Sequence, residues 1–175
     1  MEWQKPDVRA EVEPKWKALL PLLPAEPSEE AFGVNVSYTV AYWRKANHIH
    51  KWFVDNLQNG EDNCQRSYVS REKLNELLSV CHEVVKNSEL IAGHYAAGRK
   101  YTPETGWEDI YEEGQVIARP EVVAELLPTQ EGFFFGGTGY DQWYLEVVKN
   151  TISQLEDVLA EYQDKDVDFY YQASW

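Results

Sequence analysis

The sequence has few cysteines, no long apolar run and no pattern at its start that predicts a signal peptide. Its two cysteines, Cys64 and Cys81, lie 17 positions apart and in no Cys-X-X-Cys motif. This excludes a disulfide framework and favours reduced thiols. The longest apolar stretch near the N-terminus, residues 18–23, is too short to span a membrane and contains a proline. The first residues also lack the basic and apolar regions of a signal peptide. We therefore expect a cytoplasmic protein.

Basic side chains are scarce, with 16 Lys and Arg against 30 Asp and Glu, and the net charge is −14 over 175 residues. Nucleic-acid-binding proteins present a basic surface, and anionic lipids attract basic segments. The composition therefore argues against nucleic acid and membrane as partners. Aromatic residues are abundant instead: 7 Trp, 11 Tyr and 6 Phe. A chain of this length can bury a core of its own without a disulfide or a metal.

Apolar residues recur at helical spacing along most of the chain and predict a mainly α fold. The pattern predicts helices over about residues 37–57, 70–85, 89–97, 120–127 and 138–162. The second helix is the best defined, because Ser70 can cap it and its apolar residues keep strict i, i+3, i+4 spacing. The start of the first helix is ambiguous, because residues 34–40 also alternate as a strand would.

Three segments depart from the helical pattern. Five prolines among the first 27 residues predict that residues 1–33 form an extended arm that docks on a core domain of residues 34–175, with a loose tail as the alternative. Residues 101–114 hold five acidic side chains and no basic one, which predicts an exposed acidic loop inside an insertion at 99–118. Residues 169–175 alternate like a strand, and we expect them to form a small β-ribbon with the Phe-Phe-Phe-Gly segment at 133–136, burying Tyr171 and Trp175.

One group of side chains in the first predicted helix suits an anionic, nucleotide-like ligand. Two cations, a carboxamide, an imidazole and an indole lie within nine positions, and stacking next to a cation is typical of nucleotide sites. The candidate residues are Arg44, Lys45, Asn47, His50 and Trp52. A solvated basic helix face accounts for Arg44 and Lys45 equally well. A buried histidine bonded to a backbone carbonyl is the simpler explanation of His50.

The sequence contains no motif for catalysis, for a cofactor or for a metal. The cysteines and histidines lack zinc spacing. The glycines at 136, 137 and 139 fit neither a P-loop nor a dinucleotide fingerprint, and Thr138 is accounted for as a helix cap. No acid, base and nucleophile stand at a recognisable spacing. We therefore predict no catalytic residue, no metal and no cofactor.

Several long motifs carry a resemblance to known proteins. They are YWRKANHIHKWFV at 42–54, YVSREKL at 68–74, LLPTQEGFFFG at 126–136, and FYYQASW at 169–175. In these motifs the chain resembles a family of small uncharacterised phage and prophage proteins, whose members usually carry YWRKAN-X-IH-X-WF. The resemblance covers about residues 34–175. It implies a phage-type protein acting inside the host cell and implies no particular activity.

These observations predict a non-catalytic interaction protein that binds a host protein through an acidic surface, in a host-takeover or counter-defence role. The residues expected to carry that surface are Glu104, Glu108, Asp109, Glu112 and Glu113. A protein that binds or sequesters a nucleotide-like ligand at the five candidate residues is the alternative. An enzyme of unknown reaction is the second alternative.

Overall fold

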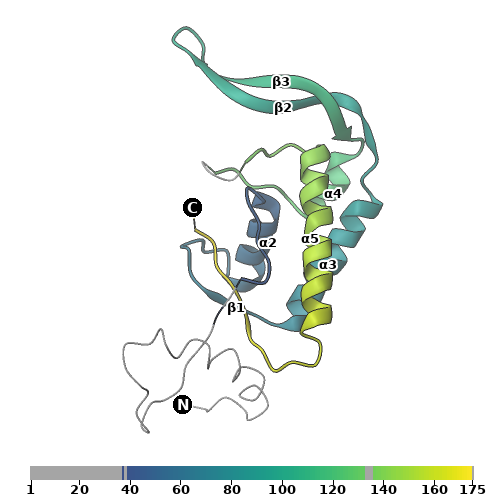
Figure 1. Cartoon of the computed structure of the whole chain (residues 1–175). Coiled ribbons are helices and arrows are strands. Elements are labelled where there is room, and N and C mark those ends of the chain that lie inside the picture. Colours follow the sequence, from purple (N-terminus) through teal and green to yellow (C-terminus); the bar gives the residue numbers. More distant parts are fainter. Residues whose placement is uncertain (1–36, 38, 133–135, 175) are drawn as a thin grey trace, which may run out of the picture.

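The computed structural model describes residues 37, 39–132 and 136–174 (Figure 1). Four helices and four strands occur within them, and the strands form two separate antiparallel pairs, β1 with β4 and β2 with β3. The prediction of a mainly α fold is therefore wrong, because the described chain is a mixed α/β protein. The predicted arm at 1–33, the phenylalanines at 133–135 and Trp175 lie outside the described residues.

Helices α3 (Arg71–Lys86) and α5 (Gln142–Glu161) pack against each other on one side of the molecule, opposite α2 (Figure 1). The predicted cap of α3 is confirmed, since the Ser70 hydroxyl accepts the Lys73 N–H. Both helices bury one apolar stripe, as their sequence period requires. The buried residues are Leu74, Leu77, Cys81 and Val84 from α3, and Tyr144, Leu145, Val148, Thr151, Leu155 and Val158 from α5.

Two further helical predictions meet different outcomes. The short helix α4 (Pro120–Leu126) is confirmed, with its proline in the first turn. Helix α5 begins later than predicted, because Asp141 rather than Thr138 caps it. The Asp141 carboxylate accepts the N–H groups of Trp143 and Tyr144 at 2.9 and 3.1 Å. Aspartate is a strong N-cap, since it satisfies two free donors at the positive end of the helix.

Helix α2 (Asn47–Leu57) is only the second half of the helix predicted at 37–57. Lys45 has φ 56°, a left-handed conformation that a right-handed helix cannot include. Ahead of it, the Trp43 indole donates to the Thr151 hydroxyl at 2.9 Å, and the Tyr42 N–H donates to Gln154 Oε1 at 2.7 Å. The residues before α2 are therefore held by contacts with α5 rather than by helical hydrogen bonds.

Strands β2 (Leu90–Thr102) and β3 (Gly106–Ile117) form one long hairpin. The predictions of a helix at 89–97 and an acidic loop at 101–114 are therefore both wrong. The pairing runs from Leu90 opposite Ile117 to Thr102 opposite Gly106, where φ is 79° in the turn, and a bulge interrupts it between Ala96 and Gly98. The hairpin crosses the N-terminal end of α5 and its tip extends away from the helices (Figure 1).

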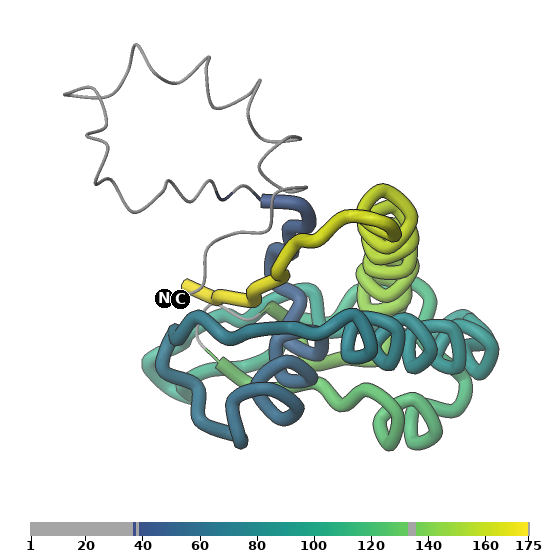
Figure 2. The backbone as a smooth tube through the Cα atoms, turned by 90° about the horizontal axis from the view of Figure 1, so that it is seen from below, coloured from purple at the N-terminus to yellow at the C-terminus, as the bar shows by residue number. Residues whose placement is uncertain are grey.

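The C-terminal strand β4 (Phe169–Tyr171) is confirmed as a strand, but its partner is β1 (Ser67–Val69). Seen from below, the segment that carries β4 passes close to α2 (Figure 2). Tyr171 is half-buried there and stacks on Phe53 with ring centroids 4.0 Å apart. Its predicted burial is thus confirmed in part. In the described part of the chain, no helix has both the length and the apolar character needed to cross a membrane.

Candidate functional site

The five predicted ligand-binding residues have three different surroundings. Arg44 and Lys45 are exposed on the irregular turn that leads into α2. The side chains of Asn47, His50 and Trp52 are buried, with exposed fractions of 2%, 8% and 8%. Each of the three faces a different neighbour, so a shared nucleotide pocket has no support in their arrangement.

Asn47 holds the loop between α4 and α5 against the start of α2. Its Nδ2 donates to the Gly137 carbonyl at 2.7 Å, and its Oδ1 accepts the Gln130 N–H at 3.0 Å. Gly136, with φ 83°, lies so close to Lys45 that a Cβ on it would stand 3.1 Å from the Lys45 carbonyl oxygen. Gly136 therefore permits a close backbone approach, and these two hydrogen bonds of Asn47 serve the fold.

His50 links three parts of the chain. Its Nδ1 lies 2.7 Å from the Tyr171 hydroxyl and its Nε2 lies 2.8 Å from Asp62 Oδ2. The order Asp62, His50, Tyr171 resembles a catalytic relay. However, burial raises the pKa of Tyr171, and its ring is stacked on Phe53. These contacts hold the ring of Tyr171 against α2, so this chain of hydrogen bonds serves to anchor β4.

His48 is buried, although the helical wheel places it on the solvent face. It is 3% exposed, and its ring centroid lies 4.4 Å from that of Tyr144. Its Nε2 is enclosed and has no hydrogen-bond partner among the residues that the structure describes. Desolvation lowers the pKa of His48 to about 3, so the imidazole is neutral at neutral pH. Helical spacing predicts the wrong exposure for His48, because Tyr144 of α5 covers a side of α2 that carries polar residues in the sequence.

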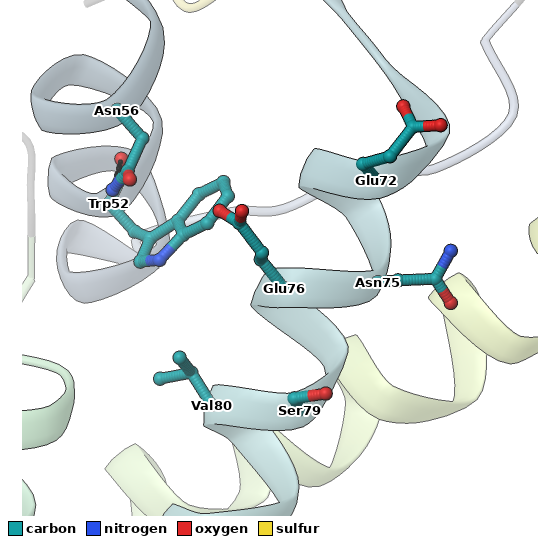
Figure 3. Close-up of a pocket in the computed structure, with 7 residues that line it drawn as sticks. All are labelled: Trp52, Asn56, Glu72, Asn75, Glu76, Ser79 and Val80. Carbon is teal, nitrogen blue, oxygen red and sulfur yellow. Dashed lines mark hydrogen bonds between the residues drawn. The ribbon is translucent and has the colours of Figure 1, made fainter.

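Trp52 borders an open groove of about 690 Å³ between α2 and α3 (Figure 3). The groove is lined by Trp52 and Asn56 from α2 and by Glu72, Asn75, Glu76, Ser79 and Val80 from α3. Among the described residues that line it, the charged ones are Glu72 and Glu76, whose carboxylates would repel a phosphate group.

The outer half of the β2–β3 hairpin exposes three large aromatic rings. The exposed fractions of Tyr101, Trp107 and Tyr111 are 62%, 64% and 62%. Alternate residues of β3 point to the same side, and Tyr101 pairs with Trp107, so all three rings lie on one face of the ribbon. We call this the aromatic face. Tyr101 and Trp107 contact each other edge to face, with centroids 5.6 Å apart.

Four of the five predicted interaction carboxylates are divided between the two faces of the same hairpin, and the fifth, Glu104, lies in its turn. Asp109 pairs with Arg99 at 2.9 Å, and Glu108 pairs with Lys100 at 3.4 Å, each across the two strands. Glu112 accepts the Tyr95 hydroxyl at 3.1 Å, a bond that raises the pKa of Tyr95. Within β2, the turn and β3, five acidic and two basic side chains leave a surplus of three negative charges. The surface is therefore acidic, but two of its carboxylates are already paired.

The sequence analysis missed the aromatic face, because it took residues 101–114 for an acidic loop. A two-residue period was present in Trp107, Asp109 and Tyr111. The basic pair at 99–100 is also mirrored by the acidic pair at 108–109 across a Thr-Pro-Glu-Thr-Gly turn. Opposite charges mirrored about a turn indicate cross-strand pairs of a hairpin.

Comparisons with known protein families, with characterised proteins and with solved structures found no match to this chain. Among the described residues, no group of three or more histidine, cysteine, aspartate or glutamate side chains is placed to hold a metal ion. The two cysteines are not bonded to each other, and burial raises the pKa of the Cys81 thiol to about 12, which makes it unreactive. The hairpin is thus the feature with the clearest functional character.

Proposed function

We propose that this chain is a non-catalytic interaction module that binds a partner protein through the β2–β3 hairpin. The observation that carries the proposal is the aromatic face, in which Tyr101, Trp107 and Tyr111 are all more than 60% exposed. Tyrosine and tryptophan are enriched among the residues that dominate binding energy at protein interfaces. The resemblance to phage proteins suggests a host protein as the partner.

The hairpin is suited to presenting these rings outside the body of the protein. Its base is anchored, because Ile117 is 3% exposed, its N–H donates to the Tyr140 carbonyl, and Val116 bridges to Asp141. Its tip extends away from the helices (Figure 1). A two-stranded ribbon is marginally stable alone, so the anchored base keeps the strand pairing that sets the aromatic rings side by side.

The charge of the hairpin indicates the chemistry of the partner. Glu104 and Glu113 make no ion pair within the described chain, and the hairpin as a whole is acidic. Complementary charge accelerates encounter and selects partners more than it adds affinity. The partner surface is therefore expected to be basic, with an apolar pocket or ledge for the rings.

The alternative hypotheses have less support. Polar atoms of Asn47 and His50 form hydrogen bonds inside the fold. Trp52 borders carboxylates, and neither Arg44 nor Lys45 is among the described residues that line its groove. A nucleotide ligand would need these groups to converge. The Asp62, His50 and Tyr171 chain holds β4 against α2, with the Tyr171 ring stacked on Phe53, and this geometry supports a structural role better than a catalytic one.

The proposal can be tested with two matched pairs of exposed rings. One variant carries Tyr101→Ser and Trp107→Ser on the hairpin. The control carries Tyr68→Ser and Tyr170→Ser, an exposed edge-to-face pair on the other sheet. Each protein is used to capture partners from a bacterial lysate, and the affinity of the captured, purified protein is then measured.

We expect the hairpin variant to lose at least about 30-fold in affinity, the loss expected for a dominant interface residue. The control variant should bind like the wild type. Replacing Glu104, Glu112 and Glu113 by glutamine should slow association and reduce its salt dependence. Equal capture by the hairpin variant and the wild type would contradict the proposal.

A further inference from the structure

The two outer edges of the β2–β3 hairpin differ. At the base, the segment that leads into α5 covers the edge of β3, where the Ile117 N–H donates to the Tyr140 carbonyl at 2.9 Å. Val116 also bridges to Asp141 there. The edge of β2 pairs with no other strand in the described part of the chain. Farther from the base, β3 carries acidic side chains at Glu108, Asp109, Glu112 and Glu113.

The backbone of β2 directs hydrogen-bonding groups to its free edge. The Ala118 N–H donates to the Glu89 carbonyl at 2.8 Å, so these two residues form a hydrogen-bonded pair across the hairpin. Bonded and non-bonded pairs alternate along an antiparallel ladder, which leaves the N–H and C=O groups of Ala92, His94 and Ala96 pointing outward. All three residues are exposed. They present to an additional strand the donors and acceptors that it needs.

The charges along this edge suit a second copy of the same strand. Residues 90–98 include no Asp, Glu, Lys or Arg. Glu89 directly precedes this stretch and Arg99 directly follows it, so the two lie symmetrically about His94. Antiparallel pairing of two copies about His94 therefore brings Glu89 of each copy next to Arg99 of the other. Arg99 uses Nε for its pair with Asp109 and keeps further N–H donors for this contact.

We infer that this protein forms a two-fold dimer in which the β2 edges of two copies pair antiparallel about His94. This register uses all the outward groups, because Ala92 lies opposite Ala96 of the second copy. The two hairpins then form one four-stranded sheet. A two-stranded ribbon that is exposed on much of both faces is marginally stable, and added strands stabilise it. Pairing through β3 would instead set Asp109 of one copy against Glu113 of the other.

The dimer uses the backbone edge of the hairpin and leaves its faces free. The two-fold axis is perpendicular to the sheet, so both copies present the aromatic face on the same side. The inference goes beyond the proposed function and does not rest on it, because the edge and the aromatic face are different surfaces.

Sedimentation-velocity centrifugation of the full chain over a range of concentrations tests the dimer. We expect a reversible monomer–dimer equilibrium with a dissociation constant in the micromolar range. His94→Lys should weaken the dimer by at least about tenfold, because two like charges would lie directly opposite each other. The control His82→Lys adds the same charge on α3, where the side chain is 53% exposed, and should dimerise like the wild type.

Amide hydrogen exchange locates the interface. At one concentration above the dissociation constant, the N–H groups of Ala92 and Ala96 should exchange at least about tenfold more slowly in the wild type than in His94→Lys. A protein that stays monomeric at millimolar concentration, or a dimer that His94→Lys leaves intact, would overturn the inference. The Tyr101→Ser/Trp107→Ser variant should dimerise like the wild type, so failure of the dimer and failure of the proposed function are distinguishable.

Discussion

The surroundings of α2 and the β2–β3 hairpin use aromatic side chains in opposite ways. Phe53 is 1% exposed and contacts the rings of Trp43, Trp52 and Tyr171. Trp107 is 64% exposed and contacts the ring of Tyr101 across the hairpin. The same residue type thus stabilises the fold in one region and is available to a partner in the other. The number of aromatic residues does not distinguish these two uses. The number of ring contacts does, since Phe53 contacts three other rings and Trp107 contacts one.

Polar side chains differ between the two regions in the same way. Around α2, Asn47 and His50 bond to groups more than 80 positions away along the chain. In the hairpin, Arg99 and Lys100 pair with Asp109 and Glu108 directly across the strands. Long-range bonds tie α2 to the rest of the fold, whereas the hairpin's ion pairs hold only the hairpin. The first region is expected to determine global stability and the second to leave it almost unchanged.

The largest expected effect is that of Phe53→Ala. Removing this ring empties the centre of an aromatic cluster and should lower the free energy of unfolding by about 3–5 kcal/mol. Urea denaturation followed by circular dichroism measures it, with Phe53→Leu as a milder control. A loss below about 1 kcal/mol would mean that the cluster around α2 does not stabilise the fold, and the contrast between the regions would disappear.

A smaller effect depends on pH and comes from His48. The pKa of His48 is lowered from 6.5 to about 3 in the fold, so between these pH values the unfolded chain binds a proton that the folded chain does not. Stability is therefore greatest above pH 6.5 and falls on acidification. This residue should contribute a loss of about 1.4 kcal/mol per pH unit between pH 6 and pH 4.

Comparison with His48→Phe isolates this contribution, because a phenyl ring can keep the contact with Tyr144 and cannot titrate. Stability of both proteins is measured by urea denaturation at each pH. Parallel pH profiles for wild type and His48→Phe would show that protonation of this site does not oppose folding.

The smallest expected effect is that of Trp107→Ala. Exposed cross-strand aromatic pairs contribute roughly 0.2–1 kcal/mol, so the free energy of unfolding should fall by less than about 1 kcal/mol. A double-mutant cycle with Tyr101→Ala measures the pair itself. If Trp107→Ala lowered the free energy of unfolding as much as Phe53→Ala, the hairpin tip would be part of the cooperative core. The proposed function, which needs the aromatic face to be free of a stabilising role, would then lose its support.

The sequence predicts best the elements whose single apolar stripe packs on one neighbour. Helix α3 is of this kind, with Ser70 at its start and buried residues at helical spacing. Helix α2 is harder, because contacts on several sides bury polar residues such as His48 and Asn47. Lys45, whose left-handed conformation interrupts the predicted helix, lies against Gly136 from a distant part of the chain, and no local feature of the sequence indicates this.

The hairpin escapes prediction for a different physical reason. Its strands are exposed on much of both faces, so burial imposes no apolar alternation on them. Cross-strand partners such as Arg99 and Asp109 are a pairwise pattern, which periodicity along one strand does not detect. Likewise, the residues that line the groove of Trp52 come from two helices, and only their packing brings Asn56 and Glu76 together.

The pairing of β4 with β1 has a consequence for the order of folding. The hydroxyl that hydrogen-bonds to His50 Nδ1 belongs to Tyr171, 121 positions later in the chain. A nascent chain emerges N-terminus first, so α2 is synthesised long before the ring that covers Phe53. Closing so long a loop is entropically costly and is rewarded only when the pairing forms. Until Tyr171 is synthesised and pairs with β1, the aromatic cluster around α2 is incomplete and Phe53 lacks its stacked ring. During this interval the exposed apolar surface of α2 would be available to a chaperone.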